Sequence, residues 1–131
     1  MKVIDSSAVV KYVCREEGWE KVQKHLATGC VTVDLTFKEL SNALWKRVVR
    51  GEINTERALQ IIETFGEGKL VRIYPQSKLM TKAFKISVEK QIPVYDSIFI
   101  ALAEQLDAPL VTSDETQAMK AEEIGVTAFL L

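Results

Sequence analysis

Short apolar runs alternate along the chain with longer stretches in which apolar residues recur at spacings of three and four. The runs predict strands at residues 2–4, 31–33, 70–73, 110–112 and 126–130. The spacing predicts helices between them, at residues 6–13, 16–27, 36–50, 55–65, 79–89, 95–106 and 115–123. Short strands that alternate with longer helices predict an α/β/α sandwich with a mainly parallel, about five-stranded sheet.

The length of the chain and the residues that end its predicted helices and strands agree with this interpretation. The chain has 131 residues, which is the length of one ordinary domain, so we expect a single domain over residues 1–131. Glycines at 29, 51 and 66 follow three of the predicted helices, and Pro75 stops the third strand. There is no internal repeat and no low-complexity linker.

Composition limits the protein's surroundings and its partners. The longest apolar runs are far shorter than the roughly 20 residues of a membrane span. An acid stands at the fifth position, which rules out a signal peptide over the first residues, so we expect a soluble, cytoplasmic protein. The formal net charge is −1, which excludes a generally basic protein that coats nucleic acid. Any nucleic-acid contact must therefore use a local basic patch.

The two cysteines, Cys14 and Cys30, have no metal-knuckle spacing. Two reduced, partly buried thiols are the simplest interpretation. A bridge between them stays open if the source is a hyperthermophile, because intracellular disulfides occur there.

Four acidic residues fall where a parallel α/β sheet places its ligands. Asp5 follows the first predicted strand, and Asp114 follows the fourth. Glu39 and Asp96 lie near the starts of helices that can point at the same edge. Because the carboxyl ends of parallel strands share one edge, we expect these four side chains to converge.

Each acid also has a purely local explanation. Asp96 and Asp114 stand where helix N-caps stand, and Asp5 can cap the first helix. The segment from Thr36 to Glu39 fits the capping-box pattern.

Together the four carboxylates create an electrostatic problem, since they repel one another and must either take up protons or attract cations. Oxygen ligands without His or Cys favour Mg²⁺ or Mn²⁺ over zinc. Such an ion supplies what phosphodiester hydrolysis needs, so the pattern predicts a nuclease site.

Four segments resemble the signatures of a known family. They are VIDSSA at residues 3–8, FKELSNAL at 37–44, YDSIFIALA at 95–103 and LVTSD at 110–114. In order and spacing they are similar to the four motifs of the PIN-domain family, and most of all to its VapC branch, the toxins of type II toxin–antitoxin pairs. The resemblance covers essentially the whole chain.

The resemblance implies an Mg²⁺- or Mn²⁺-dependent endoribonuclease whose products carry 5′-phosphate and 3′-hydroxyl ends. It makes Asp5, Glu39, Asp96 and Asp114 both catalytic residues and metal ligands. It also implies a homodimer and a small VapB-type antitoxin partner. Supporting residues under the same comparison are Ser7 and Thr112, whose hydroxyls suit a carboxylate or water, and Asn42, one turn beyond Glu39.

An RNA substrate requires cations near the acids. The candidates for RNA binding are Lys38, Lys46, Arg47 and Arg50 on one helix, and Lys11 and Arg15 on another. A solvated helix face is the competing explanation for both groups.

The aromatic residues and the only histidine give weaker signals. Trp19 and Trp45 have the spacing of core or subunit-interface residues, and Tyr95 is a weak base-stacking candidate. His25 shares a polar face with Lys21 and Lys24, so we do not expect it to be catalytic.

Two rival functions stay open. A phosphoacceptor signalling domain has the same fold class, but it needs an aspartate after the third strand, where Tyr74 and Pro75 stand. A non-catalytic PIN scaffold, which binds RNA or a protein without cleavage, is the other.

Overall fold

The structure is a computed structural model that describes residues 1–131. Its five strands form one parallel sheet in the order β3-β2-β1-β4-β5. They are β1 (Lys2–Ile4), β2 (Cys30–Val33), β3 (Arg72–Tyr74), β4 (Leu110–Thr112) and β5 (Ala128–Leu130). The predicted fold class is therefore confirmed.

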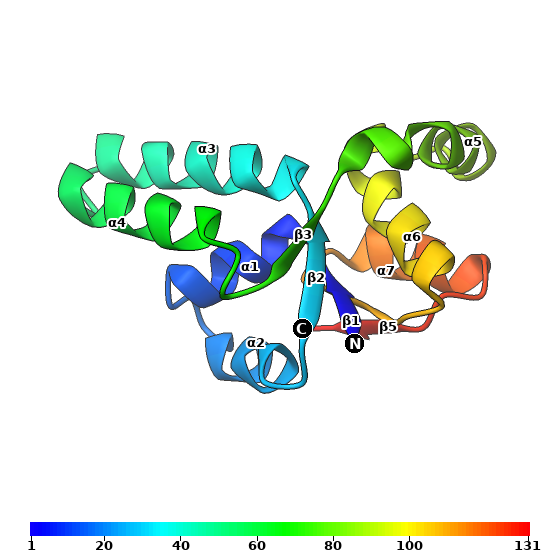
Figure 1. Ribbon diagram of the computed structural model, residues 1–131, viewed down its shortest axis with the longest axis horizontal. Coiled ribbons are helices and arrows are strands. Elements are labelled where there is room, and N and C mark those ends of the chain that lie inside the picture. Colours follow the sequence, from blue (N-terminus) through cyan, green and yellow to red (C-terminus); the bar gives the residue numbers. More distant parts are fainter.

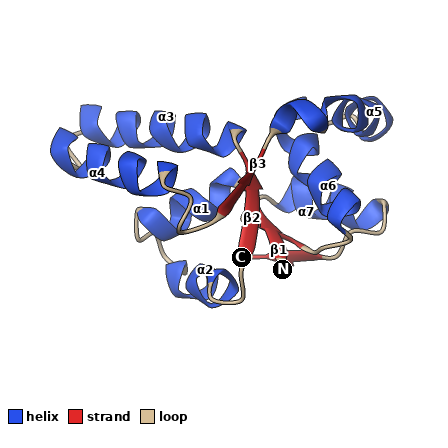
Figure 2. Cartoon of the chain, in the orientation of Figure 1, coloured by secondary structure: helices blue, strands red, loops and turns tan.

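Helices cover both faces of the sheet, as Figures 1 and 2 show with the sheet seen nearly edge-on. Helices α1 to α4 lie on one side, where α3 and α4 form a long hairpin that projects from the sheet, and α5 to α7 lie on the other. Their bounds are α1 (Ser6–Val13), α2 (Trp19–Leu26), α3 (Leu35–Val49), α4 (Thr55–Gly66), α5 (Met80–Lys90), α6 (Val94–Leu106) and α7 (Glu115–Glu123), with a short 3₁₀ helix η1 (Gln76–Lys78) before α5.

Alternation along the strands divides the core into two layers. Val3 packs with α5, α6 and α7, while its neighbour Ile4 packs with α1 to α4. Leu110 and Val111 repeat this division on β4. Successive strand residues point to opposite faces, and both faces are covered here, so the buried strand residues are mostly apolar, with Thr32 and Thr112 as the polar exceptions.

Three elements begin two or more residues later than predicted, whereas the other boundaries agree to within one residue. The second helix begins at Trp19 rather than at residue 16, because Gly18 has a φ of 87° and ends a turn there. The third strand is shifted to Arg72–Tyr74, and Val71 packs in the core just before it. The last strand is shortened to Ala128–Leu130.

The topology decides which loops meet. Strand β1 lies at the centre, with β2 on one side and β4 on the other. The backbone N–H of Asp5 donates to the carbonyl of Val111 at 3.1 Å, so the ends of β1 and β4 lie side by side. The loops that follow these two strands, far apart in the sequence, therefore form one edge.

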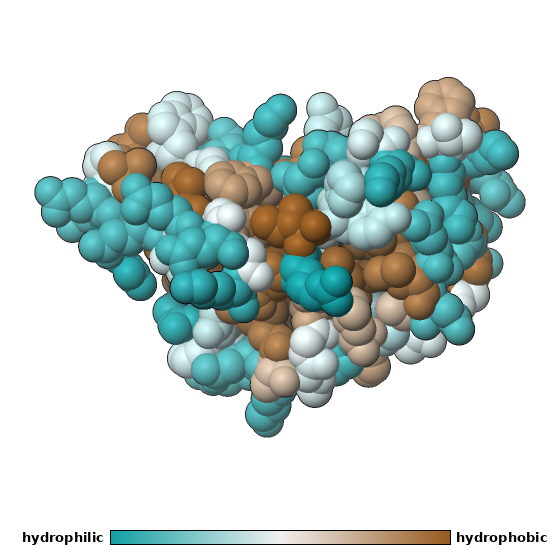
Figure 3. Space-filling view, in the orientation of Figure 1, coloured by the Kyte–Doolittle hydropathy of each residue, from teal (hydrophilic) through white to brown (hydrophobic).

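Hydrophilic residues cover much of the outer surface of the helices on the face shown in Figure 3. None of the helices combines the length and the hydrophobicity that a membrane span requires.

Helix α6 gives a direct test of the packing. Leu102 is fully buried in the layer formed by α5, α6 and α7, whereas Leu106 on the same helix is 39% exposed. We expect Leu102→Ala to lower the free energy of unfolding by about 2–5 kcal/mol, because it leaves a cavity. Leu106→Ala serves as the control and should cost less than about 1 kcal/mol. Urea denaturation measures both, and equal costs would contradict the layer assignment.

Candidate active site

Asp5 is the buried centre of the acidic edge. It caps α1 by accepting the backbone N–H of Ala8 at 3.0 Å, so its capping role is real. Its carboxylate also accepts the hydroxyls of Ser7 at 2.8 Å and Thr112 at 2.6 Å. Burial nevertheless raises the pKa of Asp5 to about 6, against the lowering effect of these hydrogen bonds.

The hydroxyl of Thr112 lies between two acceptors. Its Oγ1 is 2.6 Å from Oδ2 of Asp5 and 2.8 Å from Oε1 of Gln117, and it accepts the N–H of Asp114 at 3.0 Å. A hydroxyl has one proton, so it cannot donate to both acceptors at once. A proton on Oδ2 of Asp5 completes the chain, since Asp5 then donates to Thr112 and Thr112 donates to Gln117. This geometry agrees with the raised pKa of Asp5.

Asp114 and Gln117 connect the end of β4 to the start of α6. Asp114 caps α7 by accepting the N–H of Gln117 at 3.0 Å, so the N-cap interpretation is correct for this residue. The side chain of Gln117, which is buried, donates from Nε2 to the backbone carbonyl of Asp96 at 2.9 Å. Gln117 thus contacts both Thr112 and the backbone of Asp96.

Asp96 lies in the first turn of α6 and is not its cap. The N-cap position belongs to Pro93, so the N-cap interpretation is wrong here. Burial, and then the charges of Asp114 and Glu39, raise the pKa of Asp96. Asp114 and Glu39 therefore lie near enough to Asp96 for their charges to act on it.

Glu39 is held from the opposite side of the edge. Its helix begins at Leu35, which places Glu39 in the second turn, so the capping-box interpretation is wrong. Glu39 instead accepts the hydroxyl of Ser6 at 2.6 Å. Ser6 and Ser7 are adjacent in the sequence, and they hold Glu39 and Asp5 respectively.

The remaining aspartates have structural roles elsewhere. Asp34 accepts the backbone N–H of Gln76 at 2.9 Å. Asp107 ends α6 in the left-handed conformation, with a φ of 50°. Neither contributes to the acidic edge.

We define the acidic edge as Asp5, Glu39, Asp96 and Asp114. None of the four takes part in a salt bridge. The atoms that could bind a metal are all carboxylate oxygens, the type of ligand that Mg²⁺ and Mn²⁺ prefer. As the side chains stand, no three His, Cys, Asp or Glu groups are close enough together to hold an ion. The edge therefore has the right chemistry without being a preformed cage.

A groove of about 490 Å³ adjoins the acidic edge between α3 and the start of α6. Lys38, Glu39, Asn42, Lys46 and Tyr95 line it. Two predicted RNA-binding lysines thus share one surface with the predicted supporting residue Asn42. The Tyr95 ring is well exposed there.

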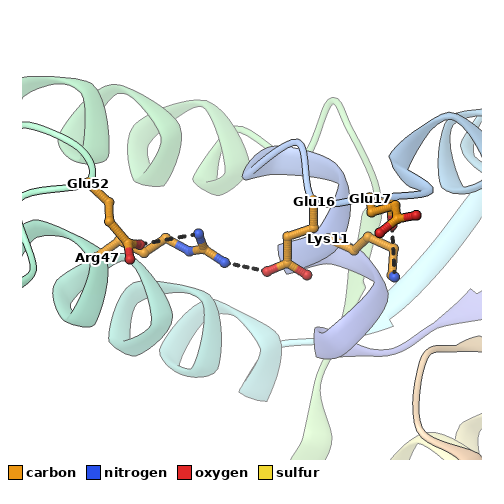
Figure 4. Close-up of polar contacts among 5 residues, drawn as sticks. All are labelled: Lys11, Glu16, Glu17, Arg47 and Glu52. Atoms are coloured by element: carbon orange, nitrogen blue, oxygen red, sulfur yellow. Dashed lines mark hydrogen bonds and ion pairs between the residues drawn. The ribbon is translucent and has the colours of Figure 1, made fainter.

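The other predicted RNA-binding cations are placed differently. Arg47 is paired with both Glu16 and Glu52, which neutralises its charge (Figure 4). Lys11 donates to the backbone carbonyl of Glu17 at 3.2 Å (Figure 4).

Arg15 and Arg50 lie away from the groove's lining. Arg15 has a φ of 54°, and its guanidinium stacks over Tyr12 and Trp19. Arg50 is exposed at the C-cap of α3. Lys38 and Lys46 are therefore the two predicted cations that line the groove beside Glu39.

The tryptophans and cysteines are also placed by the structure. Trp19 packs edge-on against Tyr12, whereas Trp45 is largely exposed, so core packing is wrong for Trp45. Cys14 and Cys30 are free, without a bridge.

Ser6 and Gln117 are contacts that the sequence analysis did not identify. Gln117 follows Asp114 by three residues, which is the spacing of a capping box. A polar residue on the inward face of α7, beside Ala118 and Ala121, was the available signal. Nothing comparable marked Ser6, because its role depends on the approach of α3 to α1.

Comparison with known proteins adds to this geometry. The sequence profile of the PIN domain matches residues 2–123. The chain belongs to the PIN-domain family. Among curated PIN-type relatives, it is 30% identical over 121 residues to "Ribonuclease VapC3" of Pyrobaculum aerophilum, covering 90% of this chain and 92% of that one. It is 26% identical over 113 residues to "Exonuclease VapC9" of the same organism, covering 86% and 79%.

Solved structures share the PIN fold. PAE2754 from Pyrobaculum aerophilum superposes with a TM-score of 0.69 at 22% identity, covering 97% of this chain and 82% of that one. A toxin–antitoxin complex from Klebsiella pneumoniae superposes with a TM-score of 0.62 at 14% identity, covering 90% of each chain. At these identities the likeness concerns the PIN fold alone.

The raised pKa of Asp5 predicts how stability depends on pH. The folded pKa of about 6 exceeds the ordinary aspartate value of 3.8, so the contribution of Asp5 to stability is fully present below pH 3.8 and is lost as pH rises through 6. The loss is about 3 kcal/mol. We therefore expect Asp5→Asn, whose amide stays neutral and still caps α1, to unfold roughly 10 °C above the wild type at pH 8 without divalent ions.

Thermal unfolding at several pH values measures this difference, which should vanish near pH 4. Asp107→Asn is the matched control, because Asp107 lies outside the acidic edge, and it should show no gain that depends on pH. A loss of stability in Asp5→Asn at pH 8 would contradict the role assigned to the buried charge.

Proposed function

We propose that the protein is a Mg²⁺- or Mn²⁺-dependent endoribonuclease of the VapC type. The observation that carries this proposal is the convergence of four carboxylates that have no cationic partner at one edge of a PIN fold. The names of the two curated relatives, a ribonuclease and an exonuclease, support nuclease activity.

Asp5, Asp96 and Asp114 would hold the ion, with Glu39 beside them. When bound, the ion supplies activation of the attacking water and stabilises the charge that develops on the phosphate oxygens. Because no three acids now stand within ligand distance of one point, holding an ion would require their side chains to move closer together.

The chain's own residues prepare this step. Ser7 and Thr112 orient the carboxylate of Asp5, and Ser6 orients Glu39. The proton that the buried Asp5 retains below a pH of about 6 must leave before its carboxylate can act as a ligand. Once Asp5 has lost this proton, the hydroxyl of Thr112 donates to Oδ2 of Asp5 instead of to Oε1 of Gln117.

The groove beside Glu39 is the proposed entry for the RNA substrate. Lys38 and Lys46 supply positive charge for phosphate groups, and Asn42 supplies a hydrogen-bonding amide. Tyr95 presents an exposed ring on which a base can stack. Together these residues offer a local basic surface in a chain whose net charge is −1.

We also propose a small antitoxin of the VapB type and a homodimer as partners. A toxin–antitoxin complex among the structures of the same fold supports the antitoxin. Met80, Phe84 and Val88 form an exposed apolar stripe on α5. A second copy can cover this stripe with its own, as a twofold axis requires.

The rival functions are less well supported. Pro75 follows β3, so the acid that a phosphoacceptor domain needs at that strand is missing. A non-catalytic scaffold would not need four unpaired acids at one edge, whose mutual repulsion is a cost to stability.

Cleavage of RNA with divalent ions tests the proposal. We expect the wild type to cleave RNA with Mn²⁺ or Mg²⁺, to lose this activity with a chelator, and to leave 5′-phosphate ends. Asp96→Asn should lower the rate by about 100-fold or more, the usual effect of removing one group that stabilises developing charge. Because the side chain of Asp96 caps no helix, the variant should keep its circular dichroism spectrum.

Asp107→Asn is again the control and should cleave at the wild-type rate. If the wild type leaves both structured and unstructured RNA intact with either ion, the scaffold function replaces the nuclease.

A further inference from the structure

A second groove, of about 460 Å³, lies between α2 and the edge strand β5. Its lining includes Lys2, Lys21, Lys24 and His25 on one side and Phe129 on the other. We call this surface the lysine groove. It lies next to both ends of the chain, which Figure 1 shows beside α2 and β5. None of the residues proposed above for catalysis or RNA binding lines it.

The lysine groove carries an excess of positive charge, since its three lysines outnumber the single C-terminal carboxylate of Leu131. None of its three lysines takes part in a salt bridge, and no acidic side chain lines it. This local excess stands out in a chain with 17 basic and 18 acidic residues. Three unpaired lysines around one groove suit an anionic partner.

One lysine is held in place by its neighbours. The Nζ of Lys2 lies 2.9 Å from Nδ1 of His25 and 5.2 Å from the centre of the Phe129 ring. The rings of His25 and Phe129 are themselves 5.1 Å apart. A charge fixed in this way loses little side-chain entropy on binding a phosphate. The partly exposed Phe129 ring adds a surface for a nucleobase.

The lysine groove leads toward the acidic edge. Strand β5 runs parallel to β4, and Thr112 pairs with Leu130. Leu131, which lines the groove, donates its N–H to the backbone carbonyl of Thr112 at 2.9 Å. Thr112 in turn contacts Asp5. One end of the groove therefore lies beside the carboxyl end of β4, the strand that precedes Asp114.

We propose that the lysine groove binds the phosphate backbone of the RNA strand beyond the cleavage point. This inference rests on the proposed function, because it takes RNA as the ligand. An extended strand fits better than a free phosphate, since the cations come from β1 and from two successive turns of α2 and are spread along the groove. The groove would thus extend the binding surface beyond the groove of Lys38 and Lys46, with which it shares no lining residue.

RNA binding without cleavage tests this proposal. In the Asp96→Asn background, we expect Lys21→Glu with Lys24→Glu to weaken binding of a single-stranded RNA of about twelve nucleotides by about tenfold or more. The slope of the affinity against salt should fall by about 1.4, for two lost phosphate contacts. Fluorescence anisotropy of the labelled RNA measures both quantities, and circular dichroism checks the fold.

The control reverses two lysines on the other side of the sheet, Lys85→Glu with Lys90→Glu, which changes the net charge equally. Its affinity should stay within about threefold of the Asp96→Asn background. An RNA of about three nucleotides, below the usual site size, should bind all variants alike because it reaches only the acidic edge.

Three outcomes would overturn the proposal. Equal losses of RNA affinity in the two charge-reversed variants would mean that the net charge of the protein, and not the lysine groove, sets the affinity. Unchanged affinity in the Lys21 and Lys24 variant, with wild-type RNA cleavage intact, would leave the nuclease function standing and assign the lysines to an acidic protein partner. Absence of any RNA binding would show that RNA is not the ligand of the lysine groove. Failure of the nuclease function alone would appear differently, as RNA binding without cleavage by the wild type.

Discussion

The structure depends on keeping the carboxylate of Asp5 buried at the end of the central strand β1, beside β4, with no cation beside it. Its burial raises the pKa to about 6, and hydrogen bonds from Ser7, Thr112 and the backbone of Ala8 only partly offset that cost. A protein gains no stability from such an arrangement at neutral pH. We propose that a bound divalent ion neutralises this charge, which explains why the site is kept.

The parallel sheet makes this crowding possible. β1 lies between β2 and β4, so the segments after these strands meet although they are separated by most of the sequence. Gln117 then links β4 to the start of α6, and Ser6 links α1 to Glu39 on α3. Side chains from four separate elements are thereby linked at one edge of the sheet. The acids remain apart enough that ion binding, in our proposal, completes the site.

Sequence reasoning captured what depends on local pattern. Periodicity of apolar residues located each strand and helix, and the rule that parallel strands end at one edge brought Asp5 and Asp114 together. It could not assign Gln117, because the pattern of a capping box conceals a side chain that turns toward another helix. The salt bridges of Arg47 and the lysine groove were equally hidden, since they depend on how distant segments pack.

The most direct test of the central claim is a calorimetric titration of the metal-free protein with Mn²⁺. We predict saturable binding by the wild type and by Asp107→Asn, and binding at least about tenfold weaker in Asp5→Asn and in Asp114→Asn, which each remove one carboxylate. No binding by the wild type, or the same affinity in all four proteins, would contradict the account.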